Sequence, residues 1–240
     1  MAKSIGILGL GRFGRMVYDH LRHRNPRIWT RTEARLEGLA GASGFEEAVA
    51  CDIVILSVPI SAMEETCRRI APLLRPGQTV IDVCSVKVGP VRVMQECLPE
   101  FVQILGTHPL FGPDSGKNGI VGLKIVLCPV RIDLPLLTRI RQELERLGLR
   151  VLEASPEEHD RQAARTQAIF HLLARAMSRL GWGDDEIATP GPDAFFRQVT
   201  TLQNDSFQLF VDMQRDNPFA AAYRREFIEA LASLDRELGG

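Results

Sequence analysis

A short apolar segment that leads directly into a glycine-rich turn and then into a helix constrains this chain more than any other feature. Residues 4–8 are typical of a buried strand, and Gly9-Leu10-Gly11-Arg12-Phe13-Gly14 follows without a gap. From Arg12 to His23 the apolar residues recur at helical spacing. A strand, a GxGxxG turn and a helix in this order predict the first βα unit of an α/β domain.

The three glycines of the turn have separate roles in a dinucleotide-binding fold. Gly9 permits the tight turn, and Gly11 lets the backbone approach a pyrophosphate at the helix N-terminus. Gly14 lets the helix pack closely on the strand. We therefore expect this turn, with Arg12 and Phe13 between its glycines, to bind a dinucleotide. The alternative is a glycine-rich turn without a ligand.

Strand and helix patterns alternate over the first part of the chain. The predicted strands cover residues 27–30, 52–57, 79–83, 101–105 and 124–127, and the predicted helices cover residues 61–74 and 133–147. Ser61 is the expected N-cap of the first of these helices. This alternation predicts a doubly wound, mostly parallel, Rossmann-like sheet in a domain spanning residues 1–153.

Strand signals stop after about residue 155, and residues 154–240 are expected to form a small all-helical domain. One long helix is predicted over Pro156–Leu180 with Ser155 as N-cap, a loop over 183–192, and further helices over 193–213 and 218–238. Seven of the 11 phenylalanines lie in this domain. Either the helices bury these rings against one another, or some rings face a partner subunit. We expect a substrate-binding domain that also forms a homodimer.

Composition excludes several classes of protein. The 29 Lys and Arg residues nearly balance the 30 Asp and Glu residues, which argues against a nucleic-acid partner. The closest two of the five cysteines, Cys84 and Cys97, are 13 residues apart, so no CxxC zinc or redox motif exists and no metal is expected. Reduced thiols, together with a start that lacks signal-peptide features, predict a cytoplasmic protein. No apolar segment approaches the ~18 residues that would cross a membrane.

The segment Thr30-Arg31-Thr32 bears on which dinucleotide binds. An NAD site places an acidic residue after the second strand to bind the ribose 2′-hydroxyl. An arginine flanked by hydroxyls suits a 2′-phosphate instead, so we expect NADP rather than NAD. The alternative is that Arg31 is a solvated surface charge. Ser57, Val58 and Pro59 follow the next strand and are expected to border the ribose.

Two more segments follow strands at the same edge of the sheet. Ser85 follows the strand at 79–83, and His108 lies in a segment rich in glycine and proline after the strand at 101–105. Ligands of such sheets bind at the carboxyl ends of the strands. A histidine beside a nicotinamide can accept the hydroxyl proton of a carbinol as hydride leaves its carbon. The pair therefore points to a dehydrogenase.

These segments together resemble the arogenate/prephenate dehydrogenases of tyrosine synthesis. The resemblance covers residues 4 to about 238 and rests on GxGxxG, D-V-C-S-V-K at 82–87, T-H-P-L-F-G-P-D-S-G-K-N-G at 107–119, E-E-H-D at 157–160 and N-D-S-F at 204–207. Bacterial prephenate-type members usually carry a Ser-His-Leu-Pro-His element in the long helix. This chain has Gln167-Ala168-Ile169-Phe170-His171 there, and in this it resembles the glutamine-containing, short plant-type arogenate branch.

The resemblance implies oxidative decarboxylation of arogenate to tyrosine, with hydride passing to NADP⁺ and no metal. His108 would be the base on the ring hydroxyl, Ser85 would position that hydroxyl, and Gln167 would contact the substrate, with His171 as a further candidate. The same activity on prephenate, or on both substrates, is the alternative. A protein of another class, an NADP-binding sensor, would bind the cofactor without turnover.

Asp205 bears on the choice of substrate. Arogenate carries an ammonium group where prephenate carries a ketone, and an acidic side chain attracts only the first. Asp205 lies in a segment that matches the substrate domain of the family. The alternative is that Asp205 caps a helix or pairs with an arginine.

Overall fold

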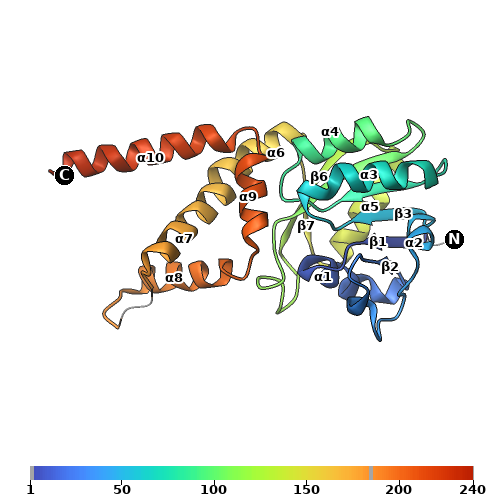
Figure 1. Ribbon diagram of the computed structural model, residues 1–240, viewed down its shortest axis with the longest axis horizontal. Helices are drawn as coiled ribbons and strands as arrows, with labels where there is room; N and C mark the ends of the chain where they lie inside the picture. The colour runs from blue at the N-terminus through green and yellow to red at the C-terminus, as the bar shows by residue number, and fades with distance from the viewer. Residues whose placement is uncertain (1–2, 184–185, 240) are drawn as a thin grey trace. The chain divides into compact units, whose positions relative to one another are not determined.

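The computed structural model describes residues 3–183 and 186–239. The chain divides into two compact units, one ending at His159 and one beginning at Asp160, and each is described by itself. The predicted division between residues 153 and 154 lies a few residues earlier in the chain. Figure 1 traces the elements of both units.

The first unit is built on one seven-stranded sheet, in the order β2-β1-β3-β4-β5-β6-β7. The strands are β1 (Ile5–Leu8), β2 (Arg27–Trp29), β3 (Ile53–Leu56), β4 (Thr79–Asp82), β5 (Gln103–Pro109), β6 (Lys124–Arg131) and β7 (Arg150–Glu153). All neighbours pair in parallel except β5 and β6. The predicted doubly wound, mostly parallel sheet is therefore confirmed.

Helices cover both faces of this sheet. One face packs against α2 (Phe45–Val49), α3 (Met63–Ile70) and α4 (Val88–Cys97), and the other against α1 (Arg12–Leu21) and α5 (Leu134–Arg146). Short 3₁₀ turns lie at Arg22–Arg24, Glu33–Leu36, Ile60–Ala62 and Ala71–Leu73. The two apolar clusters keep the strands buried, as expected for a parallel sheet with helices on both faces.

Three local predictions for this unit are wrong. Ser61 does not cap a helix, because it lies inside the 3₁₀ turn Ile60–Ala62 and Ala62 precedes α3. β5 begins at Gln103 and continues through Pro109, so His108 lies in the strand and not in a loop. The antiparallel pairing with β6 extends this strand, since His108 pairs with Val126 in the register. β7 was not predicted at all.

The second unit is helical, and the division between the units falls inside α6 (Pro156–Ala163). The π-helical segment η5 (Ala164–Ala168) follows, and then α7 (Ile169–Leu180), α8 (Pro190–Leu202), α9 (Phe207–Arg215) and α10 (Ala220–Glu237). Ser155 caps α6 as predicted, accepting a hydrogen bond from the Glu158 amide at 3.1 Å. Gly181 ends α7 in the left-handed region, with φ of 70°.

The predicted helix over 193–213 is wrong, because the chain turns between α8 and α9. Ser206 breaks the helix by capping α9, its hydroxyl accepting from the Leu209 amide at 3.1 Å. The predicted loop over 183–192 includes residues 184 and 185, which lie outside the described residues, and α8 already begins at Pro190. No helix in the described ranges is long and apolar enough to cross a membrane.

Candidate active site

The carboxyl ends of neighbouring strands bring the predicted cofactor and catalytic segments of the first unit to one edge of the sheet. The glycine turn follows β1, residues 30–32 follow β2, and residues 57–59 follow β3. Ser85 follows β4, and His108 lies near the end of β5. Because these five strands are consecutive neighbours in the sheet, the segments lie side by side.

The glycine turn leaves a space that suits a pyrophosphate. Gly9 has a φ of 104°, and a Cβ there would lie 2.2 Å from the Ser57 carbonyl oxygen. A Cβ on Gly14 would lie 2.2 Å from the Gly9 carbonyl oxygen, whereas a Cβ on Gly11 would meet no protein atom within 4 Å. The turn is therefore closed on the protein side and open at Gly11, the N-cap of α1, where a phosphate is expected.

The other predicted cofactor residues surround this turn. Arg12 is half exposed and forms an ion pair of 2.7 Å with Asp114 in the segment after β5. Phe13 and Val58 are half-buried, Thr30 is buried, and Thr32, Ser57 and Pro59 are partly or fully exposed. Arg31 is exposed and its guanidinium has no hydrogen-bond or ion-pair partner among the residues that the structure describes. Arg35 donates to the Leu10 carbonyl at 3.2 Å, which ties the segment after β2 to the turn.

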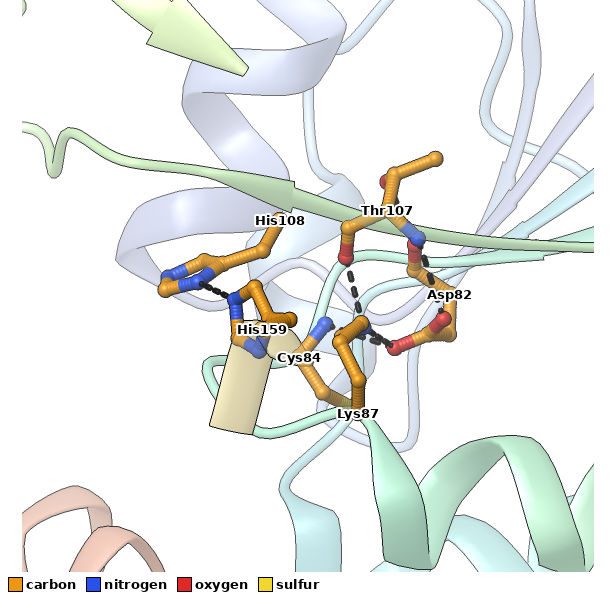
Figure 2. Close-up of polar contacts among 6 residues, drawn as sticks. All are labelled: Asp82, Cys84, Lys87, Thr107, His108 and His159. Atoms are coloured by element: carbon orange, nitrogen blue, oxygen red, sulfur yellow. Dashed lines mark hydrogen bonds and ion pairs between the residues drawn. The ribbon is translucent and has the colours of Figure 1, made fainter. Parts of the chain in front are cut away.

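A buried ion pair lies directly behind the catalytic candidates. The side chains of Asp82 and Lys87 are fully buried and form a salt bridge. The Lys87 ammonium also donates to the Thr107 carbonyl at 2.6 Å, and the Thr107 hydroxyl donates to the Asp82 carbonyl at 2.6 Å. Figure 2 shows the ammonium between the carboxylate and the carbonyl. The network fixes the backbone beside His108 to the end of β4.

His108 forms a hydrogen bond with a second histidine. Its Nδ1 lies 2.8 Å from Nε2 of His159, and both side chains are buried (Figure 2). Burial, with smaller contributions from His159 and Lys87, holds the pKa of His108 well below its ordinary value of 6.5. The ring is therefore neutral at neutral pH, and Nε2 is the nitrogen not engaged by His159.

Ser85 has a buried hydroxyl that no other described group satisfies. An unpaired buried hydroxyl costs about 1–3 kcal/mol, so a ligand oxygen that bound to Ser85 would recover this cost. Ser85 lies just beyond the end of β4, the strand that pairs with the strand of His108. A substrate hydroxyl bound at this edge could form hydrogen bonds with both Ser85 and His108.

The remaining predicted site residues lie in the helical unit. Gln167 is half-buried in η5, and His171 is buried one turn later in α7. Burial, helped by Arg175, lowers the pKa of His171 to about 4. Asp205 is half-buried in the turn between α8 and α9, and its backbone carbonyl accepts from Arg175 at 2.5 Å. Asp205 does not cap α9, because Ser206 does.

Sequence reasoning assigned no role to three residues of this network. Asp82 and Lys87 belong to the D-V-C-S-V-K motif, but their spacing of five residues does not by itself indicate an ion pair. His159 belongs to the E-E-H-D segment at 157–160, from which no functional role was predicted for it. The signal that could have identified it was a histidine at the start of the first helix after the last strand, close to the sheet edge.

Comparison with known families supports the same class of protein. The family model for the nucleotide-binding domain of prephenate dehydrogenase matches residues 15–153. A second one, described as a TYRAAT1-like C-terminal domain, matches residues 176–240.

Curated relatives match along the whole chain. Arogenate dehydrogenase 2, chloroplastic, from Arabidopsis thaliana is 31% identical over all of this chain and 71% of its own length. Arogenate dehydrogenase 1 from the same plant is 30% identical over 99% of this chain but only 39% of its own length. Cyclohexadienyl dehydrogenase from Zymomonas mobilis is 28% identical over 90% of this chain.

Solved structures share the fold. Prephenate dehydrogenase from Aquifex aeolicus, solved with hydroxyphenyl propionate and NAD⁺, superposes with a TM-score of 0.77 at 20% identity, covering 99% of this chain and 91% of the other. Synechocystis arogenate dehydrogenase gives a TM-score of 0.68 at 23% identity, covering 98% and 93%. The chain belongs to the arogenate/prephenate dehydrogenase family, whose members are nucleotide-binding dehydrogenases of aromatic amino acid synthesis.

Proposed function

We propose that this protein is an NADP-dependent arogenate dehydrogenase. In the reaction, the C4 hydrogen of arogenate leaves as hydride, the ring carboxylate leaves as CO₂, and the ring becomes the phenol of tyrosine. When bound, the oxidised nicotinamide supplies the hydride acceptor. The chain's own residues must bind both molecules, orient the C4 hydroxyl and hold its proton during hydride transfer.

His108 is proposed to hold that proton. The bond to His159 is compatible with the tautomer in which His108 Nδ1 donates, which leaves the Nε2 lone pair for the substrate. A base must be neutral to accept a proton, and burial keeps His108 neutral well below pH 6.5. The proton can return to the same oxygen once CO₂ has left, so the step needs no further acid. The buried contact between His108 and His159 is the observation that carries the proposal.

Ser85 is proposed to position the same hydroxyl. Its own hydroxyl is buried and has no other partner among the described residues, so a substrate oxygen would satisfy it. Two hydrogen-bonding groups from adjacent strand ends would fix the direction of the C4 hydroxyl, and therefore that of the departing hydride. Gln167, His171 and Asp205 are proposed as the substrate-binding residues of the helical unit.

NADP is proposed as the dinucleotide. The open space at Gly11 fits a pyrophosphate at the α1 N-terminus, and no acidic residue occupies positions 30–32. The unpaired guanidinium of Arg31 suits a 2′-phosphate, with Thr30 and Thr32 beside it. A site built for NAD would place a carboxylate where this chain has Arg31.

Arogenate is proposed over prephenate because of Asp205 and of the relatives. The two plant proteins that match most of this chain carry the name arogenate dehydrogenase. Other relatives carry the names cyclohexadienyl dehydrogenase and prephenate dehydrogenase, so prephenate is the alternative substrate.

We also propose that the protein forms a homodimer. It is proposed to function in a reducing compartment, which we expect to be the cytoplasm. The helical unit exposes large apolar side chains that a partner could cover: Leu180, Trp182, Ile187, Phe207, Ile228, Leu231 and Leu234. All five cysteines are free thiols, which suits such a compartment. Light scattering on the purified chain tests the dimer directly.

A paired assay tests the proposed function: arogenate and prephenate, each with NADP⁺ and with NAD⁺. We expect the highest kcat/KM for arogenate with NADP⁺. Higher kcat/KM with prephenate would assign the alternative substrate. Binding of NADP⁺ without turnover of either substrate would overturn the enzyme assignment in favour of a sensor.

A further inference from the structure

A cavity lies in the first unit, on the sheet face that carries α1 and α5. Its volume is about 450 Å³, and most of the residues that line it are apolar. Ile53 and Ile55 of β3 and Ile81 of β4 form its floor. Val17 of α1 and Ile140 of α5 form opposite walls.

The topology explains why this cavity exists. The crossovers that join β2 to β3, β3 to β4, and β4 to β5 place α2, α3 and α4 on the other face. β6 runs antiparallel, so its crossover to β7 places α5 on the same face as α1. Two helices then flank β3 and β4, and no helix in the described residues packs directly over these central strands on this face.

One end of the cavity is cationic. Lys3 precedes β1, Arg24 precedes β2, and Arg139 lies in the middle of α5. These positions are at the amino edge of the parallel strands, away from the active-site edge. Across the described ranges 3–183 and 186–239, no carboxylate forms a salt bridge with these three side chains. Glu143 is the acidic residue that lines the cavity.

The opposite end is apolar and reaches the back of the active site. Phe13 and Met16 from the start of α1 line it, together with Pro109 at the end of β5 and Phe111 just beyond that strand. β3 and β4 lie between the two ends. Each strand has four residues and is therefore roughly 13 Å long, about the length of an extended ten-carbon chain.

We propose that this cavity binds a single-chain amphipathic carboxylate. The carboxylate would lie among Lys3, Arg24 and Arg139, and the hydrocarbon chain would run over β3 and β4 toward Phe111. Three cations against one acid favour an anionic head, and the apolar walls favour a hydrocarbon body. The volume accommodates one chain, so a free carboxylate fits and a two-chain lipid does not. The cavity shares Phe13 with the predicted cofactor turn, but the proposal does not depend on dehydrogenase activity.

Titration calorimetry of the full chain with decanoate tests the proposal. We expect saturable binding of one decanoate per chain, and each methylene removed from the ligand to weaken binding about three- to four-fold. Decyltrimethylammonium has a similar chain and the opposite charge, and it should bind about 10-fold more weakly or not at all. Equal affinity for the two head groups, or no saturable binding of decanoate, would overturn the proposal.

Two matched pairs of variants locate the site. Ile140→Trp should fill the cavity and abolish binding, whereas Leu152→Trp, at an exposed residue of β7 outside the cavity, should not. Arg139→Glu should weaken binding about 10-fold, whereas Arg150→Glu, which makes the same change of charge elsewhere, should leave it unchanged. Melting temperatures identify any variant that fails to fold. If both variants of each pair change the affinity for decanoate equally, the ligand does not bind in this cavity.

Discussion

Nδ1 of His108 and Nε2 of His159 lie 2.8 Å apart, although 51 residues separate them in the chain. The contact joins the end of β5 to the first helix after the sheet. It occupies one nitrogen of each buried ring and so limits the orientation of the His108 ring. If His108 is the base, as we propose, this contact holds its Nε2 in one position relative to the substrate.

Replacement of His108 should reduce turnover without reducing cofactor affinity. We expect His108→Asn to lower kcat about 10²–10⁴-fold, the usual effect of losing a group that accepts the proton. The dissociation constant for NADP⁺, measured by fluorescence titration, should stay within two-fold because the glycine turn is on other strands. A kcat close to that of the wild type would remove His108 from the base role.

The pH dependence of kcat/KM should report the low pKa of His108. The neutral ring is active and the protonated ring is not, so activity is lost as the pH falls through this pKa. Since burial holds the pKa well below 6.5, the wild type should keep its activity well below pH 6.5. His159→Asn removes one of the causes of the shift, so the pKa of His108 should rise and the acid limb should move to higher pH.

The same variant distinguishes a positioning residue from a packing residue. Loss of the bond should also lower kcat at the pH optimum about 10- to 100-fold, because the ring can then rotate away. A variant whose melting temperature falls while its pH profile and kcat stay unchanged would show that His159 only packs. Glu157→Gln, at an exposed residue in the same helix, is the matched control.

Much of the first unit could be predicted because its signals are local. The strand–turn–helix order around Gly9 and the alternation of apolar segments depend on neighbouring residues, and both the sheet and the edge that collects Ser85 and His108 follow from them. β5 could not be bounded in this way, because its extension to Pro109 depends on pairing with β6, a partner remote in sequence. The bond between His108 and His159 is missed for the same reason.

In the helical unit a single capping residue divides one predicted helix into two. Apolar periodicity continues through 193–213 and alone predicts one helix, because it takes no account of the Ser206 hydroxyl. The hydroxyl competes for backbone amides, and the chain turns at 203–206. Asp205 therefore lies in the turn between α8 and α9 instead of on a helix face.

Breaking the buried ion pair behind His108 should destabilise the fold. Lys87→Met leaves the Asp82 carboxylate buried without its cation, which costs about 3–5 kcal/mol of unfolding free energy. Urea unfolding followed by circular dichroism measures this loss. The double variant Asp82→Asn with Lys87→Met removes both charges and should recover part of it. If the double variant is no more stable than Lys87→Met alone, the loss does not come from an uncompensated charge.

Removal of the Arg31 guanidinium should affect one dinucleotide and not the other. We expect Arg31→Ala to raise KM for NADP⁺ about 10- to 100-fold, as for the loss of a charged hydrogen-bond donor, with KM for NAD⁺ unchanged. Arg27→Ala is a suitable control, because Arg27 is an exposed arginine at the other end of β2. An unchanged KM for NADP⁺ in the Arg31 variant would show that Arg31 is a solvated surface charge.

Asp205 should decide between the two substrates. Its carboxylate would attract the ammonium of arogenate and has nothing to offer the ketone of prephenate, so Asp205→Asn should lower kcat/KM for arogenate relative to prephenate. We expect the ratio to change about 10-fold or more, the effect of one charged contact. The Asp205 carbonyl that Arg175 contacts belongs to the backbone and remains in place in this variant. Asp193→Asn, at the start of α8, controls for the loss of an acidic charge in the same unit. An unchanged ratio, with both values reduced equally, would mean that Asp205 supports the turn between α8 and α9 and does not read the substrate's amino group.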